Sequence, residues 1–438
     1  MPFAWYAGWT QQESGNIDMH DQTIEHQPSC EDELNTGLLT VTQAQERILD
    51  GVSPVTGSER LPVREALGRV LAQEIVSPID VPSHTNSAMD GYAVRAADMP
   101  ETGVREFPVP GTSWAGRPWL EPIEPGQAVQ IMTGGMMPEG ADTVVMQEQV
   151  ERDGDTVRIG SGHRAGQNVR AAGEDLATGQ PVFSAGRQLT AADIGVLASL
   201  GLAEVSVYRC LRVAFFSTGD ELRGVGEPLG PGEIYDSNRY TLHGMLSRLG
   251  VELLDLGVVR DRREALRQVF SDAATIADVV ITSGGVSVGE EDHVRIAIEQ
   301  LGSISMWRLR IKPGKPLVLG RVEGTPIIGL PGNPVSAFVT GLLFVRPFLL
   351  KMQGLSDVLP ASYPVTAGFE WTRPGIRREF LRAQVRNENG EAIAEIYPHQ
   401  GSGVLSSTCW ADGLVVIPEE TTVARGDRVQ FMPFGELL

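Results

Sequence analysis

The stretch from Ile281 to Asp292 reads ITSGGVSVGEED, and an apolar run that begins at Ala277 leads into it. A short apolar run that ends at a Gly-Gly pair is typical of a buried parallel strand followed by a tight loop. Because Gly284 and Gly285 have no Cβ atom, backbone amides from Ser283 onward can approach a ligand closely. The pattern therefore predicts an anion-binding loop at the carboxyl end of a strand.

Three acidic residues, Glu290, Glu291 and Asp292, end the stretch. They would repel a bare phosphate but can hold Mg²⁺ beside one, which predicts a site for a phosphorylated ligand and a metal. No Gly-Lys-Ser/Thr follows, so the stretch is not a P-loop, and it is not the GxGxxG fingerprint of dinucleotide-binding proteins. Taken alone, the glycines fit a structural turn equally well.

Strands and helices alternate around this stretch. The expected elements, in order, are Arg212 to Phe216, Asn238 to Leu249, Val251 to Val259, Arg263 to Ala274 and Val279 to Ile281. Such alternation predicts a parallel sheet with helices on both faces, in which ligands lie beyond the carboxyl ends of the strands. The loop from Ser217 to Glu221, Asp261 and the opening stretch all fall at that edge.

Cationic loops follow in the same region. A strand from Met306 to Lys312 is expected to end in the loop KPGKP, which carries Lys312 and Lys315. The turn GLPGNP (329–334) then begins a helix from Val335 to Leu350, with Asn333 as its cap and Pro334 in its first turn. The amino end of that helix is free to face an anion.

The remaining chain divides by composition. Residues 1–37 are acidic and without periodicity, so we expect them to be disordered. Thr40 and Gln43 form a capping-box pattern before a helix, and further helices are expected from Val63 to Leu71 and from Leu189 to Gly201.

Short β segments rich in Gly and Pro lie between these helices, which indicates a β domain inserted into a helical one. Asp90 lies in an Asp-Gly turn pattern, so it is either a structural turn residue or a carboxylate presented on a loop. Thr133, before two glycines, is either part of a turn or a ligand contact. After Gly354 the chain is β again, and its polar residues of interest, Arg382 and Ser402, also fit ordinary strand and turn positions.

Composition limits the class of protein. A chain of 438 residues predicts about three domains. The net charge of −20 argues against nucleic acid or an anionic membrane as a partner. Cys30, Cys210 and Cys409 have no metal-site spacing and are expected to be reduced thiols. Neither an export signal nor a run of 18 apolar residues is found, so we expect a cytoplasmic protein.

Eight longer motifs follow one another along the chain. They are NSAMDGYAVR (86–95), IMTGGMMPEGADTVVMQE (131–148), NVRAAGED (168–175), FSTGDEL (216–222), YDSNR (235–239), TSGGVSVGEEDHV (282–294), KPGKP (312–316) and GLPGNPVSA (329–337). Together they resemble the MoeA family, the molybdopterin molybdenumtransferases, which includes the E domain of gephyrin. The resemblance covers about residues 38–438, and the joint set of motifs is far more specific than any one loop.

The resemblance implies a multidomain α/β and β fold. The expected units are a MogA-like three-layer α/β/α domain (211–355), a discontinuous helical linker domain (38–80 and 173–210), an inserted small β domain (81–172) and a C-terminal β-barrel domain (356–438).

It also implies insertion of molybdenum from molybdate, a substrate, into adenylylated molybdopterin with Mg²⁺ present, releasing AMP. The chain would form a homodimer with a shared active site and receive its substrate from a molybdopterin adenylyltransferase.

Residue roles are implied by position in the matching motifs. Asp90, Thr133, Asp175, Glu221, Asp261 and Asp292 would be catalytic, with Asp90 and Thr133 supplied by the partner subunit and with Asp292 and Glu221 as metal ligands. The substrate would contact Ser283, Gly284, Gly285, Ser287, Pro331, Asn333 and Pro334. Molybdate would contact Lys312, Lys315, Arg382 and Ser402.

Two other functions stay open at this point. The first is a molybdopterin adenylyltransferase, because the sheet domain occurs alone with that activity; ATP dependence would distinguish it. The second is a non-catalytic scaffold like the gephyrin E domain. The two added β domains favour the transferase over the first alternative, and the retained acidic positions favour it over the second.

Overall fold

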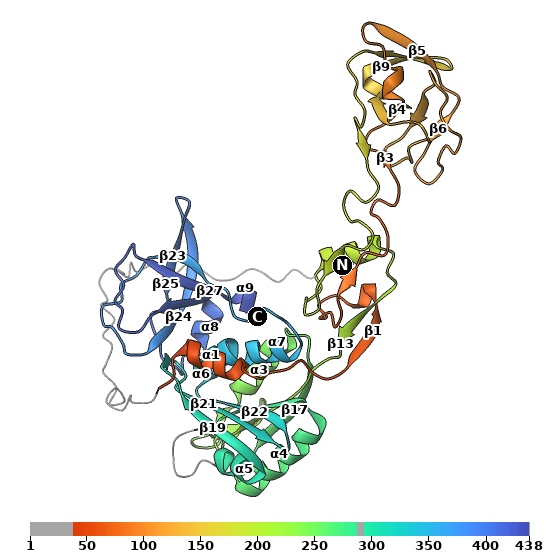
Figure 1. Cartoon of the computed structure of the whole chain (residues 1–438). Coiled ribbons are helices and arrows are strands. Elements are labelled where there is room, and N and C mark those ends of the chain that lie inside the picture. The colour runs from red at the N-terminus through yellow and green to blue at the C-terminus, as the bar shows by residue number, and fades with distance from the viewer. Residues whose placement is uncertain (1–37, 287–292, 438) are drawn as a thin grey trace, which may run out of the picture.

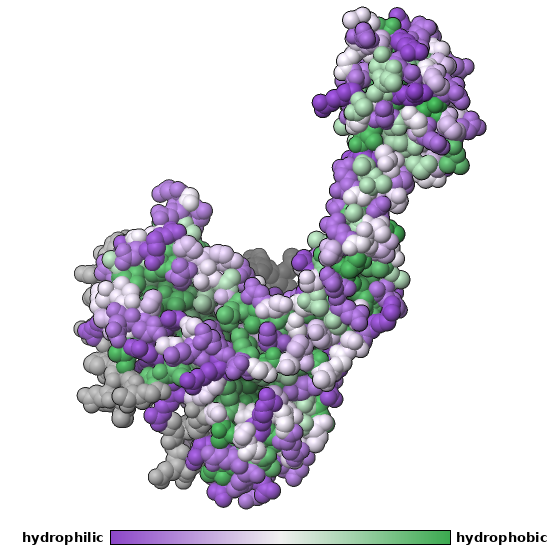
Figure 2. Space-filling view, in the orientation of Figure 1, coloured by the Kyte–Doolittle hydropathy of each residue, from purple (hydrophilic) through white to green (hydrophobic). Residues whose placement is uncertain are grey.

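The computed structural model describes residues 38–286 and 293–437. The sheet domain and the C-terminal barrel lie together, and an arm rises away from them to the inserted β domain (Figure 1). Figure 2 shows the arm as a narrow stem between the two ends of the molecule. Predictions for 1–37, Ser287 and Glu290 to Asp292 lie outside the described residues.

The sheet domain contains a six-stranded sheet with the order β17-β14-β18-β22-β21-β19. Its strands are β17 (Glu252–Val259), β14 (Arg212–Thr218), β18 (Val279–Ser283), β22 (Thr325–Leu330), β21 (Pro316–Val322) and β19 (Gly302–Arg308). The first four are parallel, as predicted, whereas β21 is antiparallel to both neighbours. Glu323 and Gly324 both have positive φ, so a tight hairpin turn reverses the chain between β21 and β22.

Helices cover both faces of this sheet. They are α3 (Ser237–Ser247), α4 (Arg263–Ile276), α5 (His293–Leu301), α6 (Pro334–Thr340), η4 (Gly341–Val345) and α7 (Arg346–Met352). Side chains of β14 alternate between the two cores: Phe215 packs with α3 and the run from α6 to α7, and Phe216 packs with α4 and α5. The predicted three-layer α/β/α arrangement is confirmed.

The run from Pro334 to Met352 is long and apolar enough to cross a membrane by composition alone. Its most apolar window is 89% buried inside the fold. Packing in the core of the sheet domain therefore accounts for its composition.

The expected strand from Met306 to Lys312 is wrong in one respect, because it is two strands in two sheets. β19 ends at Arg308, and β20 (Ile311–Lys312) pairs with the barrel strand β24 (Arg378–Glu388). Between them, backbone hydrogen bonds join Arg308 and Arg310 to Leu39. Alternating hydrophobicity continues through this exchange of partners, so the pattern does not reveal it.

The linker is built from two short antiparallel pairs and one α-helix. They are β1 (Ser58–Pro62) with β13 (Glu204–Tyr208), β2 (Ile75–Val76) with β12 (Pro181–Phe183), and α2 (Ala191–Ser199). The helix expected from Val63 to Leu71 is wrong: only the 3-10 turn η1 (Val63–Glu65) forms. Gly68 has a φ of 76°, and Leu71 donates its backbone hydrogen bond to Arg187, which draws this segment into a strand-like pairing.

The helix α1 (Val41–Leu49) has the predicted capping box between Thr40 and Gln43. Its apolar residues Val41, Ala44 and Ile48 pack into the core of the sheet domain rather than into the linker. The predicted limits of the domains stay predictions. Only the packing of α1 departs from them, because this helix lies within the range predicted for the linker but packs against the sheet domain.

The inserted domain has a four-stranded, a three-stranded and a two-stranded sheet. The strands are β6 (Thr112–Ser113), β7 (Val129–Ile131), β4 (Gly91–Val94) and β8 (Thr143–Met146); β5 (Val104–Pro108), β10 (Thr156–Gly160) and β9 (Val150–Asp153); and β3 (Asn86–Ser87) with β11 (Val169–Arg170). Phe107, Val145 and Ile159 belong to its own buried core, so the domain is an independently packed unit.

The C-terminal domain is a closed five-stranded barrel, as predicted. Its order is β24, β25 (Glu391–Ile396), β23 (Tyr363–Ala367), β27 (Arg428–Pro433) and β26 (Gly413–Ile417), and pairing of β24 with β26 closes it. Two short helices, α8 (Ser406–Trp410) and α9 (Phe434–Leu437), accompany the strands.

Candidate functional site

The carboxyl end of β18 is tied to two neighbouring loops. The Ser283 Oγ accepts a hydrogen bond from Asn238 Nδ2 at 2.8 Å and donates one to the Pro331 carbonyl at 3.3 Å. Asn238 Nδ2 also donates to the Gly332 carbonyl at 2.7 Å. The Gly-Gly loop, the first turn of α3 and the GLPGNP loop therefore form one connected edge.

Gly284 and Gly285 meet a steric requirement at this edge. Their φ angles are 92° and 64°, values that residues with a side chain rarely adopt. A Cβ atom on Gly284 would lie 2.2 Å from the Thr218 carbonyl oxygen, and one on Gly285 would lie 2.5 Å from Val294 Cγ2. Gly284 is therefore required for the close approach of β18 to the end of β14, and Gly285 is required for the close approach of the loop to α5.

Several buried polar atoms near this edge have no partner among the described residues. They are Thr218 Oγ1, Thr282 Oγ1 and Asp236 Oδ2. The other oxygen of Asp236 is occupied, because Ser217 Oγ and the Arg239 backbone N–H both donate to Oδ1. Unpaired polar atoms are costly inside a protein and are usually satisfied by water, ions or ligands.

Asp236 and Asn238 are site residues that the sequence reasoning missed. Both lie in the motif YDSNR, which supports the family resemblance but had no predicted site residue. A signal was available: an Asp directly before a predicted helix is a typical N-cap residue, and here it places the helix N-terminus next to the strand end.

The acids of the sheet domain gather around Asp261. Burial raises the pKa of Asp261 above its ordinary value; nearby His293 opposes this rise, and Asp220 and Glu221 add to it. Among the described residues, Asp261 Oδ1 is buried without a hydrogen-bond partner, as is His293 Nδ1. The structure thus brings Glu221 and Asp261 into one electrostatic cluster, to which His293 is an unpredicted addition.

The predicted metal ligands are Glu221 and Asp292, and Asp292 lies outside the described residues. Within 38–286 and 293–437, no group of three or more His, Cys, Asp and Glu side chains is arranged to hold a metal ion. The unpartnered Asp261 oxygen beside Glu221 is nevertheless a hard oxygen donor of the kind that Mg²⁺ prefers.

The loop KPGKP packs against the helix α6. A Cβ atom on Gly314 would lie 2.6 Å from Thr340 Cγ2, which shows how closely the loop backbone approaches that helix. Lys312 Nζ forms an ion pair with Glu379 Oε2 at 3.2 Å, and Lys315 is half-buried. The two lysines therefore lie where the sheet domain meets the barrel.

Ser402 and Arg382 come from the barrel side of the same junction. The Ser402 carbonyl accepts the Val335 backbone N–H at 3.0 Å, so the loop HQGSG meets the first turn of α6, beside Asn333 and Pro334. Asn333 is exposed and makes no side-chain cap hydrogen bond. Within the described part of the chain, this exposed side chain therefore has no capping role.

Arg382 differs from the other predicted molybdate contacts because it is fully buried. Its guanidinium donates to Ser407 Oγ at 3.0 Å and to the Gly401 carbonyl at 3.1 Å, and burial lowers its pKa to about 10. The guanidinium therefore remains charged at neutral pH, and its hydrogen bond to the Gly401 carbonyl holds the HQGSG loop in place. Its predicted contact with molybdate stays a prediction.

Asp90 and Thr133 form a pair in the inserted domain. Asp90 Oδ1 accepts the Thr133 backbone N–H at 2.7 Å and the Thr133 Oγ1 hydroxyl at 2.8 Å. This domain stands at the far end of the arm from β18, so the pair does not meet the sheet-domain site within one chain (Figure 1). Asp175 is exposed near the base of the inserted domain, where its backbone N–H bonds to the Val81 carbonyl.

Three family models match this chain. They are the MoeA N-terminal region (domain I and II) at residues 39–201, the probable molybdopterin binding domain at 214–351, and the MoeA C-terminal region (domain IV) at 364–434. A molybdopterin molybdenumtransferase of Haemophilus influenzae is 42% identical over 405 residues, which cover 92% of this chain and 100% of that protein. The chain belongs to the MoeA family.

Other MoeA relatives agree with this assignment. A molybdopterin molybdenumtransferase of Nostoc sp. is 37% identical over 376 residues, covering 83% of this chain and 86% of the relative. The crystal structure of a molybdopterin biosynthesis MoeA protein from Pyrococcus horikoshii OT3 has 30% sequence identity and a TM-score of 0.78, covering 90% of this chain and 100% of that one. The whole architecture, arm included, is thus a MoeA architecture.

Asp90 provides a pH prediction for this MoeA chain. The Thr133 backbone N–H and then its hydroxyl lower the pKa of Asp90 below its ordinary 3.8. Thr133→Val removes the hydroxyl donor but keeps the backbone donor, so the pKa of Asp90 should rise part of the way back. Any support from the ionised pair is present above the ordinary pKa and disappears as the pH falls through the lowered one.

The measurement is an NMR titration of the Asp90 carboxyl group in both proteins. The Asp80–Thr178 pair has the same backbone and hydroxyl donors, so Asp80 is an internal control whose pKa should stay lowered. An unchanged Asp90 titration in Thr133→Val would contradict the assignment.

Proposed function

We propose that this chain is a molybdopterin molybdenumtransferase, a transferase that inserts molybdenum from molybdate into adenylylated molybdopterin and releases AMP. The observation that carries the proposal is the 42% identity to a protein of that name over all of its length. No observation favours the adenylyltransferase or the scaffold.

The Gly-Gly loop supports binding of the adenylate phosphate. Its backbone amides follow a parallel strand, at the edge where α/β sheets bind ligands, and its neighbours carry buried polar atoms that no other described residue satisfies. We assign the substrate contacts to Ser283, Gly284, Gly285, Pro331, Asn333 and Pro334, with Ser287 from the undescribed segment.

Molybdate is a compact oxyanion, so it requires cations and hydrogen-bond donors. We assign it to the junction between sheet domain and barrel, where Lys312, Lys315 and Ser402 converge around α6. Arg382 contributes there at least by holding the loop that carries Ser402.

Mg²⁺ fits the acidic cluster of the sheet domain. Asp261 and Glu221 would hold it, together with Asp292, because a buried carboxylate oxygen without a partner gains a counter-charge when a cation binds. When bound, the ion would neutralise negative charge that develops on the phosphoanhydride. The protein itself would orient the adenylate on the Gly-Gly loop and hold the acidic side chains beside it.

We also propose a homodimer with a shared active site, and the positions of the acids support it. Asp90 and Thr133 occupy the end of the arm, remote from the sheet edge of their own chain (Figure 1). If both groups serve one reaction, a second copy must supply one of them, and two-fold symmetry then creates two equal sites.

The substrate also defines a partner and a compartment. Adenylylated molybdopterin has to be made by an adenylyltransferase, so we propose that such an enzyme delivers it. We propose that the reaction takes place in the cytoplasm, on the basis of the cysteine pattern.

The test of the function uses purified full-length protein, adenylylated molybdopterin, molybdate and Mg²⁺. We expect AMP release that depends on molybdate and a product that reconstitutes an apo-molybdoenzyme. Incubation with ATP and unmodified molybdopterin is the control, and activity there with no molybdate-dependent AMP release would contradict the proposal.

A further inference from the structure

The arm is connected to the sheet domain by two chain segments. One runs from α1 into β1 at Ser58, and the other runs from β13 at Tyr208 into β14 at Arg212. Because β1 and β13 pair in register from Ser58 with Tyr208 onward, the two segments enter the arm together. Whatever fixes these segments fixes the direction of the arm.

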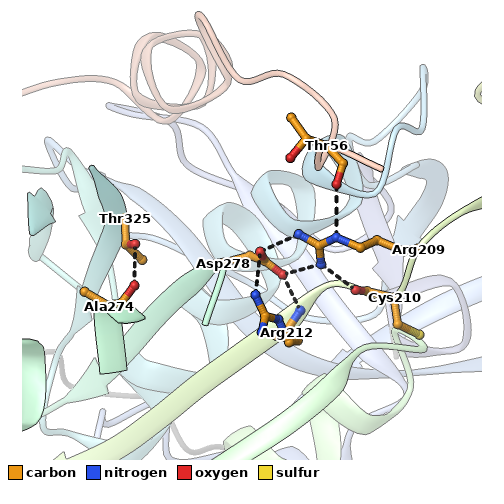
Figure 3. Close-up of polar contacts among 7 residues, drawn as sticks. All are labelled: Thr56, Arg209, Cys210, Arg212, Ala274, Asp278 and Thr325. Carbon is orange, nitrogen blue, oxygen red and sulfur yellow. Dashed lines mark hydrogen bonds and ion pairs between the residues drawn. The ribbon is translucent and has the colours of Figure 1, made fainter. Parts of the chain in front are cut away.

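Arg209 contacts both segments and the sheet domain at once (Figure 3). Its Nε donates to the Thr56 carbonyl at 3.0 Å, and its backbone N–H donates to the Gly57 carbonyl at 3.2 Å. The two terminal nitrogens donate to Asp278 at 2.8 Å and 2.7 Å, which is the paired geometry of the strongest Arg–carboxylate contacts.

Asp278 is also fixed by a hydrogen bond from the sheet domain. One carboxylate oxygen accepts the Arg212 backbone N–H at 2.8 Å, and the side chain is 13% exposed. Burial acts to raise the pKa of Asp278, but the hydrogen bonds from Arg209 and Arg212 outweigh it, and the pKa is lowered. The pair is therefore charged and ordered at neutral pH.

The position of Asp278 directly before β18 explains why its contact with Arg209 matters. It precedes β18, the strand whose other end carries Ser283 and the Gly-Gly loop. Arg209 thus joins the base of the arm to the strand that presents the anion-binding loop. A second ion pair of the linker, Arg60–Glu204, lies on β1 and β13 and is exposed, with side-chain exposures of 74% and 47%.

We propose that Arg209 and Asp278 are positioning residues that set the direction of the arm, so that Asp90 and Thr133 reach the sheet-domain site of the partner subunit. The inference rests on the proposed shared site. The pair touches no substrate; it acts by holding two rigid parts at one angle, and a displacement of about 1 Å at the reacting groups is enough to slow an enzyme about 100-fold.

The test compares full-length Arg209→Met, Arg209→Lys and Asp278→Asn with Arg60→Met as the matched control. Small-angle X-ray scattering, with molar mass from light scattering, measures the distance distribution of each protein. AMP release gives kcat and KM, and calorimetric binding of AMP reports on the sheet-domain loop alone.

We expect Arg209→Met and Asp278→Asn to broaden the distance distribution and to lower kcat by about 10- to 100-fold, while AMP binding changes less than about twofold. Arg209→Lys keeps the charge, so its distance distribution and its kcat should lie between those of Arg209→Met and the wild type. Arg60→Met should match the wild type in both measurements. If Arg209→Met is unstable, Asp278→Asn and Arg209→Lys carry the comparison.

Unchanged scattering in Arg209→Met and Asp278→Asn would overturn the inference, as would equal losses of AMP binding and kcat. A wild-type protein that releases no AMP would instead refute the proposed function, and scattering would still decide whether the pair sets the arm.

Discussion

Gly284→Ala is expected to abolish most molybdate-dependent AMP release and to destabilise the sheet domain. The new methyl group would lie 2.2 Å from the Thr218 carbonyl oxygen, and the residue has a φ of 92°. The strained backbone and the clash each cost about 1–3 kcal/mol, so the free energy of unfolding should fall by about 2–6 kcal/mol. Because the loop must shift away from β14, activity should fall about 100-fold or more.

Gly332→Ala is the matched control in the facing loop. A Cβ atom there meets Gly284 Cα at 3.7 Å, an ordinary contact, and Gly332 does not have positive φ. Its free energy of unfolding should change by less than about 0.5 kcal/mol. Denaturant unfolding and AMP release measure both effects, and equal behaviour of the two variants would refute a special requirement at Gly284.

Local patterns predicted the elements whose causes are local. The Thr40–Gln43 capping box and the strand expected from Arg212 to Phe216 depend on residues a few positions apart, and both are found as expected. The same holds for the strand β18 and the glycines that follow it, because they are contiguous in the chain. The place of the Gly-Gly loop at the carboxyl edge was therefore predictable, whereas its contacts with Asn238 and Pro331 join segments 45 and 48 residues apart.

Contacts between distant segments account for what the sequence did not reveal. The segment Val63 to Leu71 has helix-compatible residues, but pairing near Arg187 determines its conformation. The burial of Arg382 depends on carbonyls 17 to 19 residues away, and Arg209 meets Asp278 across 69 residues. None of these long-range pairings leaves a periodic signal.

Two inactive variants should restore activity when they are combined in one dimer. Asp90→Asn alters the pair at the end of the arm, and Asp261→Asn alters the acidic cluster of the sheet domain. Each homodimer should lose most AMP release, because both of its sites carry the change. A heterodimer purified through two different tags contains one site with both changes and one with neither, so it should show about half of the wild-type activity.

The control heterodimer combines Asp261→Asn with Glu221→Gln, two changes on the same side of the site. In that dimer each site has one altered sheet domain, so no recovery is expected. Recovery in the first heterodimer and none in the second requires that the arm of one subunit serves the sheet edge of the other. If the site lay within one chain, every site in both heterodimers would carry one change, and neither would exceed its parent variants.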